Sequence, residues 1–336
     1  MKKVLQIIDL HVSFQTYGGS VQAVRGVNLD VYENETLVIV GESGCGKSVT
    51  SQSIMRLLPA YSANVEKGEI WFHDRNLLTL SEKQMRAIRG VEISMIFQDP
   101  MTALNPTLTI GDQLMEAAKG HQKRTKKEIK EAAVQMLDLV GIPEPKERLK
   151  QYPHQFSGGM RQRLMIAMAL ICEPQVLIAD EPTTALDVTI QAQILEQIQA
   201  IQQKTGISII FITHDLGVVA QVADRVAVMY GGKIVELGTR RDIFYHPQHP
   251  YTKGLLRSVP RLDLKGDLIP IEGSPPDLFA PPKGCPYTER CPDAMKVCDH
   301  IMPHETHRSS THSVCCWLQD ERAKQTIVSL AQRGSM

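Results

Sequence analysis

A glycine-rich loop between an apolar run and a helical pattern constrains the fold of this chain more than any other feature. Residues 37–40 form a continuous apolar run, as in a strand that is buried on both faces. Residues 48–58, after the loop, are expected to form a helix that Pro59 stops. The loop itself reads Gly41-Glu42-Ser43-Gly44-Cys45-Gly46-Lys47-Ser48. Strand, loop and helix in this order predict a phosphate-binding loop in an α/β sheet.

The residue types of this loop suit a nucleoside triphosphate. Its glycines let backbone N–H groups surround a β-phosphate, Lys47 neutralises β/γ charge, and the Ser48 hydroxyl can ligate Mg²⁺. Cys45 is incidental to this chemistry. A plain glycine-rich turn is the alternative, and it leaves the flanking strand and helix unexplained. The loop therefore predicts binding of ATP or GTP with Mg²⁺.

Composition and charge exclude several classes of partner. The 336 residues include 37 Lys and Arg against 37 Asp and Glu, so no overall basic field favours nucleic acid or anionic lipid. The short basic segment at 123–127 is interpreted as a solvated face. Apolar runs stay below the roughly 18–20 residues of a spanning helix. Gln6 and Asp9 interrupt the start of the chain where a secretory signal would be apolar. We expect a cytosolic protein, or one peripheral on a cytosolic surface.

Strand patterns recur along the chain, with a helical stretch between them. Capping-box spacing at Ser81–Gln84 and Thr125–Glu128 predicts two helix starts, and the pattern is helical from about residue 110 to 169. Beyond about residue 245 the strand–helix rhythm is lost, and prolines and cysteines crowd residues 246–316. We predict an α/β nucleotide domain at 1–245 with a helical subdomain at about 100–170, and a C-terminal extension at 246–336. Strands are expected as short segments within 1–35 and at 37–40, 92–97, 176–179, 208–213, 226–230 and 233–236.

A second phosphate-contacting element lies near the end of the helical stretch. Ser157-Gly158-Gly159 opens a helix, where backbone N–H groups and a hydroxyl can contact a phosphate. The chain already has one complete phosphate loop. This element therefore suggests a nucleotide that is bound by another subunit.

Two carboxylates and a histidine end two further apolar strands. Asp180 and Glu181 follow the run at 176–179, and His214 follows the run at 208–213. Asp180 is expected to hold Mg²⁺ through water, and Glu181 to accept a proton from the attacking water. A histidine at a strand end is usually structural, but here its position suits a sensor of the γ-phosphate.

Over residues 1–245 these motifs together resemble the ATP-binding-cassette (ABC) ATPases. The resemblance implies a P-loop core with an antiparallel β subdomain and a helical subdomain. It also implies that Gln98 contacts the metal and the attacking water, that the Ser157 element contacts the nucleotide of an opposing subunit, and that Asp187 lies at the dimer seam. An aromatic residue near the start of the chain usually stacks on adenine in this family. Tyr17 is the candidate, Phe14 is the second choice, and an ordinary strand residue is the alternative.

The residues that flank the Ser-Gly-Gly element indicate a particular branch of this family. The family commonly has Leu-Ser-Gly-Gly-Gln, whereas this chain has Phe156 and Met160 at the outer positions, so a polar contact from the fifth position is lost. The longer strings at 156–163 and 97–106 are similar to ATPases of dipeptide and oligopeptide importers, as are His249-Pro250-Tyr251-Thr252 and Gly284-Cys285-Pro286-Tyr287. The resemblance implies a second ATPase subunit, often a different one, two transmembrane permease subunits, and indirectly an extracytoplasmic peptide-binding protein. It places the chain on the cytoplasmic face of the cell membrane.

The extension carries a group of cysteines. Cys285, Cys291, Cys298 and either Cys315 or Cys316 supply four thiolates, enough for a closed tetrahedral set. None of these pairs has Cys-x-x-Cys spacing. The importer ATPases can carry a [4Fe–4S] cluster in this region, which by resemblance makes Cys316 the fourth ligand. Zinc and plain reduced thiols remain alternatives.

The predicted function is ATP hydrolysis that powers import of dipeptides or oligopeptides. An ATPase does not touch the cargo, so nickel chelates or glutathione stay open. A soluble ABC protein of translation or DNA repair is the rival class. A single cassette without a basic stripe or a long heptad insert disfavours it. A P-loop kinase would leave Ser157–Gly159 and His214 without a role.

Overall fold

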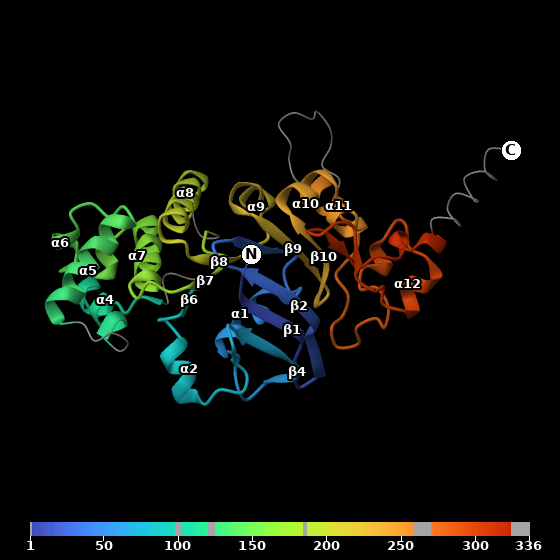
Figure 1. Cartoon of the computed structure of the whole chain (residues 1–336), viewed down its shortest axis with the longest axis horizontal. Helices are drawn as coiled ribbons and strands as arrows, with labels where there is room; N and C mark the ends of the chain where they lie inside the picture. Colours follow the sequence, from blue (N-terminus) through green and yellow to red (C-terminus); the bar gives the residue numbers. More distant parts are fainter. Residues whose placement is uncertain (1, 98–102, 120–124, 184–186, 259–269, 324–336) are drawn as a thin grey trace.

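The computed structural model describes residues 2–97, 103–119, 125–183, 187–258 and 270–323. Two β-sheets form the centre of the molecule. In Figure 1, helices α4–α7 lie at one end of the long axis and the C-terminal segment with α12 lies at the other. Among the described residues, no helix combines the length and apolar character needed to cross a membrane.

The smaller sheet is antiparallel and has the strand order β2-β1-β4-β5. Its strands are β1 (Lys3–Thr16), β2 (Gly19–Tyr32), β4 (Ala63–Phe72) and β5 (Arg75–Asn76). The expectation of several short strands within residues 1–35 is wrong, because β1 and β2 are each 14 residues long. Register shifts between Ile7 and Leu10, beside Asp9 with φ 45°, let β1 continue through the break in its apolar pattern.

The larger sheet has the order β11-β12-β10-β9-β3-β8-β7-β6. Parallel pairing joins β9 to β3, β3 to β8, β8 to β7 and β7 to β6. Strand β3 is buried on both faces, as its continuous apolar run predicts. Val38 and Val40 belong to one hydrophobic core, and Leu37 and Ile39 to the other. The strands are β3 (Thr36–Val40), β6 (Ile93–Ile96), β7 (Val176–Asp180), β8 (Ser208–Thr213), β9 (Arg225–Tyr230), β10 (Lys233–Thr239), β11 (Thr306–His307) and β12 (Ser313–Val314).

Helices begin where the capping signals predict. Ser81 and Thr125 each form a capping box, at the starts of α2 and α5. Helix α1 is shorter than expected, because the backbone turns left-handed at Arg56 (φ 49°), three residues before Pro59. The helices are α1 (Lys47–Met55), α2 (Glu82–Ile88), α4 (Ile110–Lys119), α5 (Lys126–Leu139), α6 (Pro145–Arg148), α7 (Gly158–Leu170), α8 (Val188–Thr205), α9 (Leu216–Val222), α10 (Arg240–Tyr245), α11 (Pro250–Arg257) and α12 (Lys296–His300), with 3₁₀ turns η1 (Pro153–Gln155), η2 (Thr288–Arg290) and η3 (Trp317–Gln319).

The C-terminal segment packs on the larger sheet. Strand β12 pairs antiparallel with β10. Tyr251, Cys285, Tyr287 and Cys298 belong to the same hydrophobic core as one face of β3. The division of the chain at residue 245 stays a prediction, and the segment beyond it shares this core.

Candidate functional site

The glycine-rich loop connects the end of β3 to the start of α1. A Cβ at Gly41 would lie 2.1 Å from the carbonyl oxygen of Met229 on the neighbouring strand β9. Gly46 has φ 106° and caps α1, and a Cβ there would lie 2.4 Å from the Ala23 carbonyl oxygen. Both positions therefore require glycine. The loop is held tightly between β9 and β2, with the N-terminus of α1 at its end.

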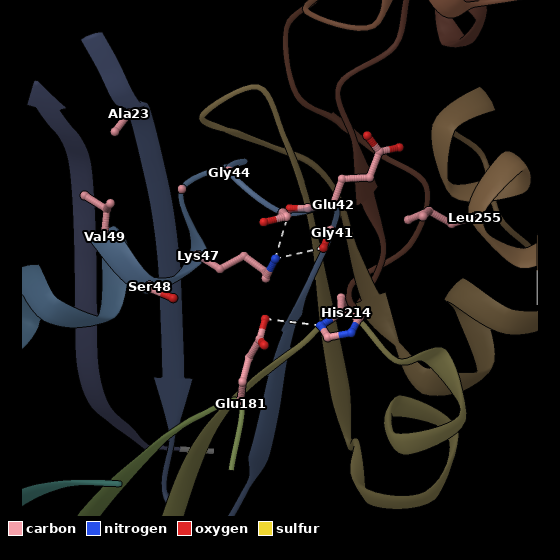
Figure 2. A pocket seen from close by; sticks show the side chains of 12 residues that line it. Ala23, Gly41, Glu42, Gly44, Lys47, Ser48, Val49, Glu181, His214 and Leu255 are labelled. Atoms are coloured by element: carbon pink, nitrogen blue, oxygen red, sulfur yellow. Dashed lines mark hydrogen bonds and ion pairs between the residues drawn. The ribbon is translucent and has the colours of Figure 1, made fainter. Parts of the chain in front are cut away.

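The Lys47 ammonium group lies over the loop. Its Nζ donates hydrogen bonds to the carbonyl oxygens of Gly41, at 2.8 Å, and Glu42, at 3.0 Å. Lys47 is 5% exposed, so this charge is held in place rather than solvated. Figure 2 shows it at the centre of the cavity, facing the side where Glu181 lies. A phosphate group at this position would be bound by a fixed cation.

Ser48 and Asp180 meet across the site. The Ser48 hydroxyl donates a hydrogen bond of 2.9 Å to Oδ1 of Asp180, which ends β7. Burial raises the pKa of the Asp180 carboxyl, and the hydrogen bond from Ser48 opposes that rise. A hydroxyl and a carboxylate side by side fit the oxygen ligands that Mg²⁺ takes in nucleotide sites.

Glu181 and His214 form a pair at the ends of neighbouring parallel strands. Nδ1 of His214 lies 3.2 Å from Oε1 of Glu181. The Glu181 side chain is 14% exposed and that of His214 is 55% exposed. Glu181 has φ 46°, a strained backbone for a glutamate, which turns its side chain out of the strand line. The carboxylate thus faces the phosphate loop and has a histidine beside it (Figure 2).

The phosphate loop, Glu181 and His214 line one cavity of about 680 Å³, and Asp180 adjoins it through its hydrogen bond to Ser48. That volume suits a small-molecule ligand. Seven of the eight loop residues line it, together with Glu181 and His214, whereas Cys45 is buried behind the loop. Ala23, Val49 and Leu255 also line it and were not predicted from the sequence. Leu255 comes from α11 in the C-terminal segment and lacks any motif that could have signalled it.

Other predicted residues lie away from this cavity. Tyr17 is fully exposed at the turn between β1 and β2 and does not line it. Ser157 caps α7 by accepting a hydrogen bond from the Met160 N–H (3.3 Å), and Asp187 caps α8 through the Ile190 N–H (3.0 Å). Gln98 lies outside the described residues.

The starts of α7 and α8 lie against each other. A Cβ at Gly159 would lie 2.7 Å from Cγ2 of Ile190. Ser157, Gly158 and Asp187 are all exposed. The Ser-Gly-Gly element and Asp187 therefore share one open surface, with their helix N-termini uncovered.

Four cysteines line a separate, small cavity of about 10 Å³, namely Cys285, Cys291, Cys298 and Cys316. Burial is the main reason why the pKa values of the Cys285 and Cys316 thiols rise to about 12 and that of Cys291 to about 11. After burial, the neighbouring Cys285, Cys291 and Cys298 also raise the pKa of Cys316, whereas the charges that act on the pKa of Cys315 after burial are mainly those of Glu305 and Lys233. The thiols suit a soft metal, but none of the described side chains form a group of three or more His, Cys, Asp or Glu that could hold a metal ion.

Comparison with known proteins identifies the family to which this chain belongs. Residues 24–184 match the ABC transporter family. The structure is similar to the dimeric post-hydrolysis state of the ATP-binding cassette MJ0796 bound to ADP and Pi, with a TM-score of 0.63 and 25% identity over 70% of this chain and 99% of that one. These similarities confirm the predicted α/β cassette fold. The chain belongs to the ABC transporter family as an ATP-hydrolysing subunit.

The C-terminal segment matches a more specific family, that of peptide transporters. Residues 235–298 match the family "Oligopeptide/dipeptide transporter, C-terminal region". The dipeptide transport ATP-binding protein DppD of Bacillus subtilis is 69% identical over 98% of both chains. The oligopeptide transport ATP-binding protein OppD of the same organism is 58% identical, over 94% of this chain and 89% of its own.

Proposed function

We propose that this chain hydrolyses ATP to power import of dipeptides or oligopeptides through a membrane ABC transporter. One observation carries the proposal: the phosphate loop and the Glu181–His214 pair line a single cavity, and Asp180 bonds to Ser48 of that loop, in a chain whose C-terminal segment matches peptide transporters. Nickel chelates and glutathione remain alternative cargoes, because the residues of this site serve ATP and not the cargo.

The residues of the site divide the chemistry between them. Lys47 and the loop N–H groups bind the phosphates, and Ser48 and Asp180 would hold Mg²⁺, together with Gln98. The metal would supply charge neutralisation on the phosphates. Glu181 accepts the proton of the attacking water, and His214 holds that carboxylate and senses the γ-phosphate. Tyr17 is the proposed stacking partner of adenine, with Phe14 as the alternative.

A second ATPase subunit completes the site. The exposed start of α7, with Ser157, Gly158 and Gly159, is proposed to contact the nucleotide of the partner, and Asp187 lies at the same surface. The similar cassette is described as dimeric, which supports this arrangement. A heterodimer is proposed, in which both subunits contribute to two composite sites.

Two permease subunits and a peptide-binding protein are the remaining proposed partners, and the chain is proposed to bind the cytoplasmic face of the cell membrane. Nucleic acid is not a proposed partner. Purification from membranes with the permease pair, followed by labelled-peptide uptake into proteoliposomes, tests this. Uptake should require ATP and stop in Lys47→Ala. Co-purification with ribosomes or DNA in place of permeases would favour the rival soluble class.

The four cysteines around the small cavity are proposed to hold a [4Fe–4S] cluster, with zinc as the alternative metal. The support is their shared cavity and the position of Cys316 among them. The cavity is too small for a cluster as it stands, so the lobe would have to open around one. Iron analysis and visible absorbance of anaerobically purified protein test the cluster. Zinc alone would replace it, and absence of both metals would leave reduced thiols.

A further inference from the structure

Glu42 belongs to the phosphate loop, but its side chain faces the C-terminal segment. In Figure 2 its carboxylate is turned away from the Lys47 ammonium group, on the side where Leu255 lies. The side chain is 24% exposed. A nucleotide bound in this loop brings several negative charges, so a free carboxylate among the loop residues would repel it.

Arg290, in the turn before Cys291, neutralises this carboxylate. Its Nη1 donates to Oε2 of Glu42 at 2.8 Å and to Oε1 at 3.1 Å, and also to the Tyr230 hydroxyl at 3.0 Å. Further hydrogen bonds from the guanidinium reach the carbonyl oxygens of Ile271 and Glu272. The Arg290 side chain is 6% exposed, so the ion pair is shielded from solvent. Burial alone would lower the pKa of Arg290, but the bonds to Glu42 and Tyr230 raise it, and the group stays charged.

Tyr251 holds the main chain of the same loop residue. The Glu42 N–H donates to the Tyr251 hydroxyl at 3.0 Å. The ring of Tyr251 packs against Tyr230, at 4.4 Å between centroids, and against Tyr287, at 5.3 Å. Tyr287 also packs against Tyr230 at 5.2 Å. This aromatic cluster joins strand β9, helix α11 and the segment around the cysteines, so the anchor of Glu42 is rigid.

We propose that Arg290 is a positioning residue for nucleotide binding, which holds the Glu42 carboxylate away from the phosphates and makes the C-terminal segment part of the ATP site. The inference rests on the proposed nucleotide site and goes beyond it, because the proposed function gives no residue of the extension a role at that site. Leu255, from the same segment, forms a wall of the cavity. By linkage, nucleotide binding and ordering of this segment stabilise each other.

The test compares the affinity for MgATP of four proteins: wild type, Arg290→Ala, Glu42→Gln and the double variant. Arg290→Ala should bind MgATP about tenfold more weakly, a typical size for coupling between sites. The MgATP affinity of the double variant should lie within about twofold of that of Glu42→Gln. Once the carboxylate is absent, the loss of the guanidinium should no longer affect binding. The turnover of fully bound enzyme should change far less than its affinity.

Several outcomes would overturn the inference. Unchanged affinity in Arg290→Ala would do so, as would a double variant as weak as Arg290→Ala, which would mean that Arg290 only supports the fold. Arg225→Ala is the control, because it breaks another shielded ion pair (Arg225 Nη1 to Glu35 Oε1, 3.0 Å) away from the cavity and should keep the wild-type affinity for MgATP.

If Arg290→Ala does not fold, the MgATP affinities of Arg290→Lys and Arg290→Gln decide the question. Equal affinities of these two variants would refute the charge argument. Wild-type protein that bound no MgATP would refute the nucleotide site itself.

Discussion

The two adjacent carboxylates at the end of β7 have different surroundings. Asp180 is 5% exposed and accepts the Ser48 hydroxyl, whereas Glu181 leaves the strand in a left-handed conformation toward His214. Asp180 is the proposed ligand of the cation, and Glu181 is the proposed acceptor of the proton. The sequence predicted these two roles, but the conformation that separates the carboxylates is visible only in the structure.

Glu181→Gln should leave MgATP binding intact and lower hydrolysis by about 10²–10⁴-fold, the usual contribution of a general base. The amide keeps the shape of the side chain but cannot accept the proton of the attacking water. Nucleotide binding and phosphate release, measured on the same preparation, check this. Glu196→Gln, on an exposed part of α8, is the control. Hydrolysis near the wild-type rate in Glu181→Gln would remove Glu181 as the base.

His249 is a fully buried histidine of the C-terminal segment. Its Nδ1 accepts a hydrogen bond from the Tyr251 N–H at 3.0 Å and caps α11, and the His249 backbone N–H donates to the buried carboxylate of Glu236. Burial, with a smaller contribution from Lys253, lowers the pKa of His249 to about 3. The folded protein therefore keeps this ring neutral at pH values where the unfolded chain protonates it.

The stability of the protein should consequently fall with pH below about 6.5. Between about 6.5 and 3 the unfolded state binds a proton that the folded state does not, so this group costs about 2 kcal/mol of unfolding free energy by pH 5. His249→Asn keeps a capping oxygen but cannot titrate. Denaturant unfolding at pH 7.5, 6.5 and 5.5 should show a smaller loss in the variant. Equal pH slopes would contradict the assignment.

At the scale of elements, helix starts are more predictable than strand lengths. A capping box is a local contact between residues three apart, so Ser81–Gln84 and Thr125–Glu128 could be identified in the sequence. The lengths of β1 and β2 could not, because bulges beside Asp9 depend on pairing with partner strands. The early end of α1 at Arg56 likewise precedes the proline that the sequence offers as a stop.

The close contact between α7 and α8 gives a matched pair of glycine variants. Gly159→Ala should destabilise the protein by about 1–3 kcal/mol, because its methyl group meets the stiff β-branched Ile190. A Cβ at Gly158 meets nothing within 4 Å, so Gly158→Ala should not lower the stability. Thermal unfolding of both variants checks this. Equal losses of stability in the two variants would show that the contact with Ile190 is not the reason for glycine at position 159.

At the scale of the whole molecule, the Ser157 surface and the phosphate loop lie apart, since none of the residues Ser157, Gly158, Gly159 and Asp187 lines the cavity of the phosphate loop. If the proposed roles hold, one copy of this chain carries two separate half-sites. Pairing with a second cassette is the arrangement that would use both of them.

With MgATP, Glu181→Gln protein should stay monomeric alone and dimerise when the second ATPase subunit is added, if the proposed heterodimer is correct. Slow hydrolysis should let the closed dimer accumulate. Light scattering with and without nucleotide measures this. Ser157→Arg should block the dimer while leaving ATP binding to the P-loop intact. A stable homodimer of Glu181→Gln would contradict the heterodimer.

The sequence by itself determined the cassette class and the position of the glycine-rich loop, because each motif is a short contiguous segment whose chemistry is local. The tertiary structure alone decided what surrounds that loop. Tyr251 and Arg290 contact Glu42 from 209 and 248 residues away, and Leu255 closes the cavity from the same segment. Such contacts arise from the packing of the extension against β9 and the hydrophobic core, and no sequence pattern indicates that these residues reach the loop.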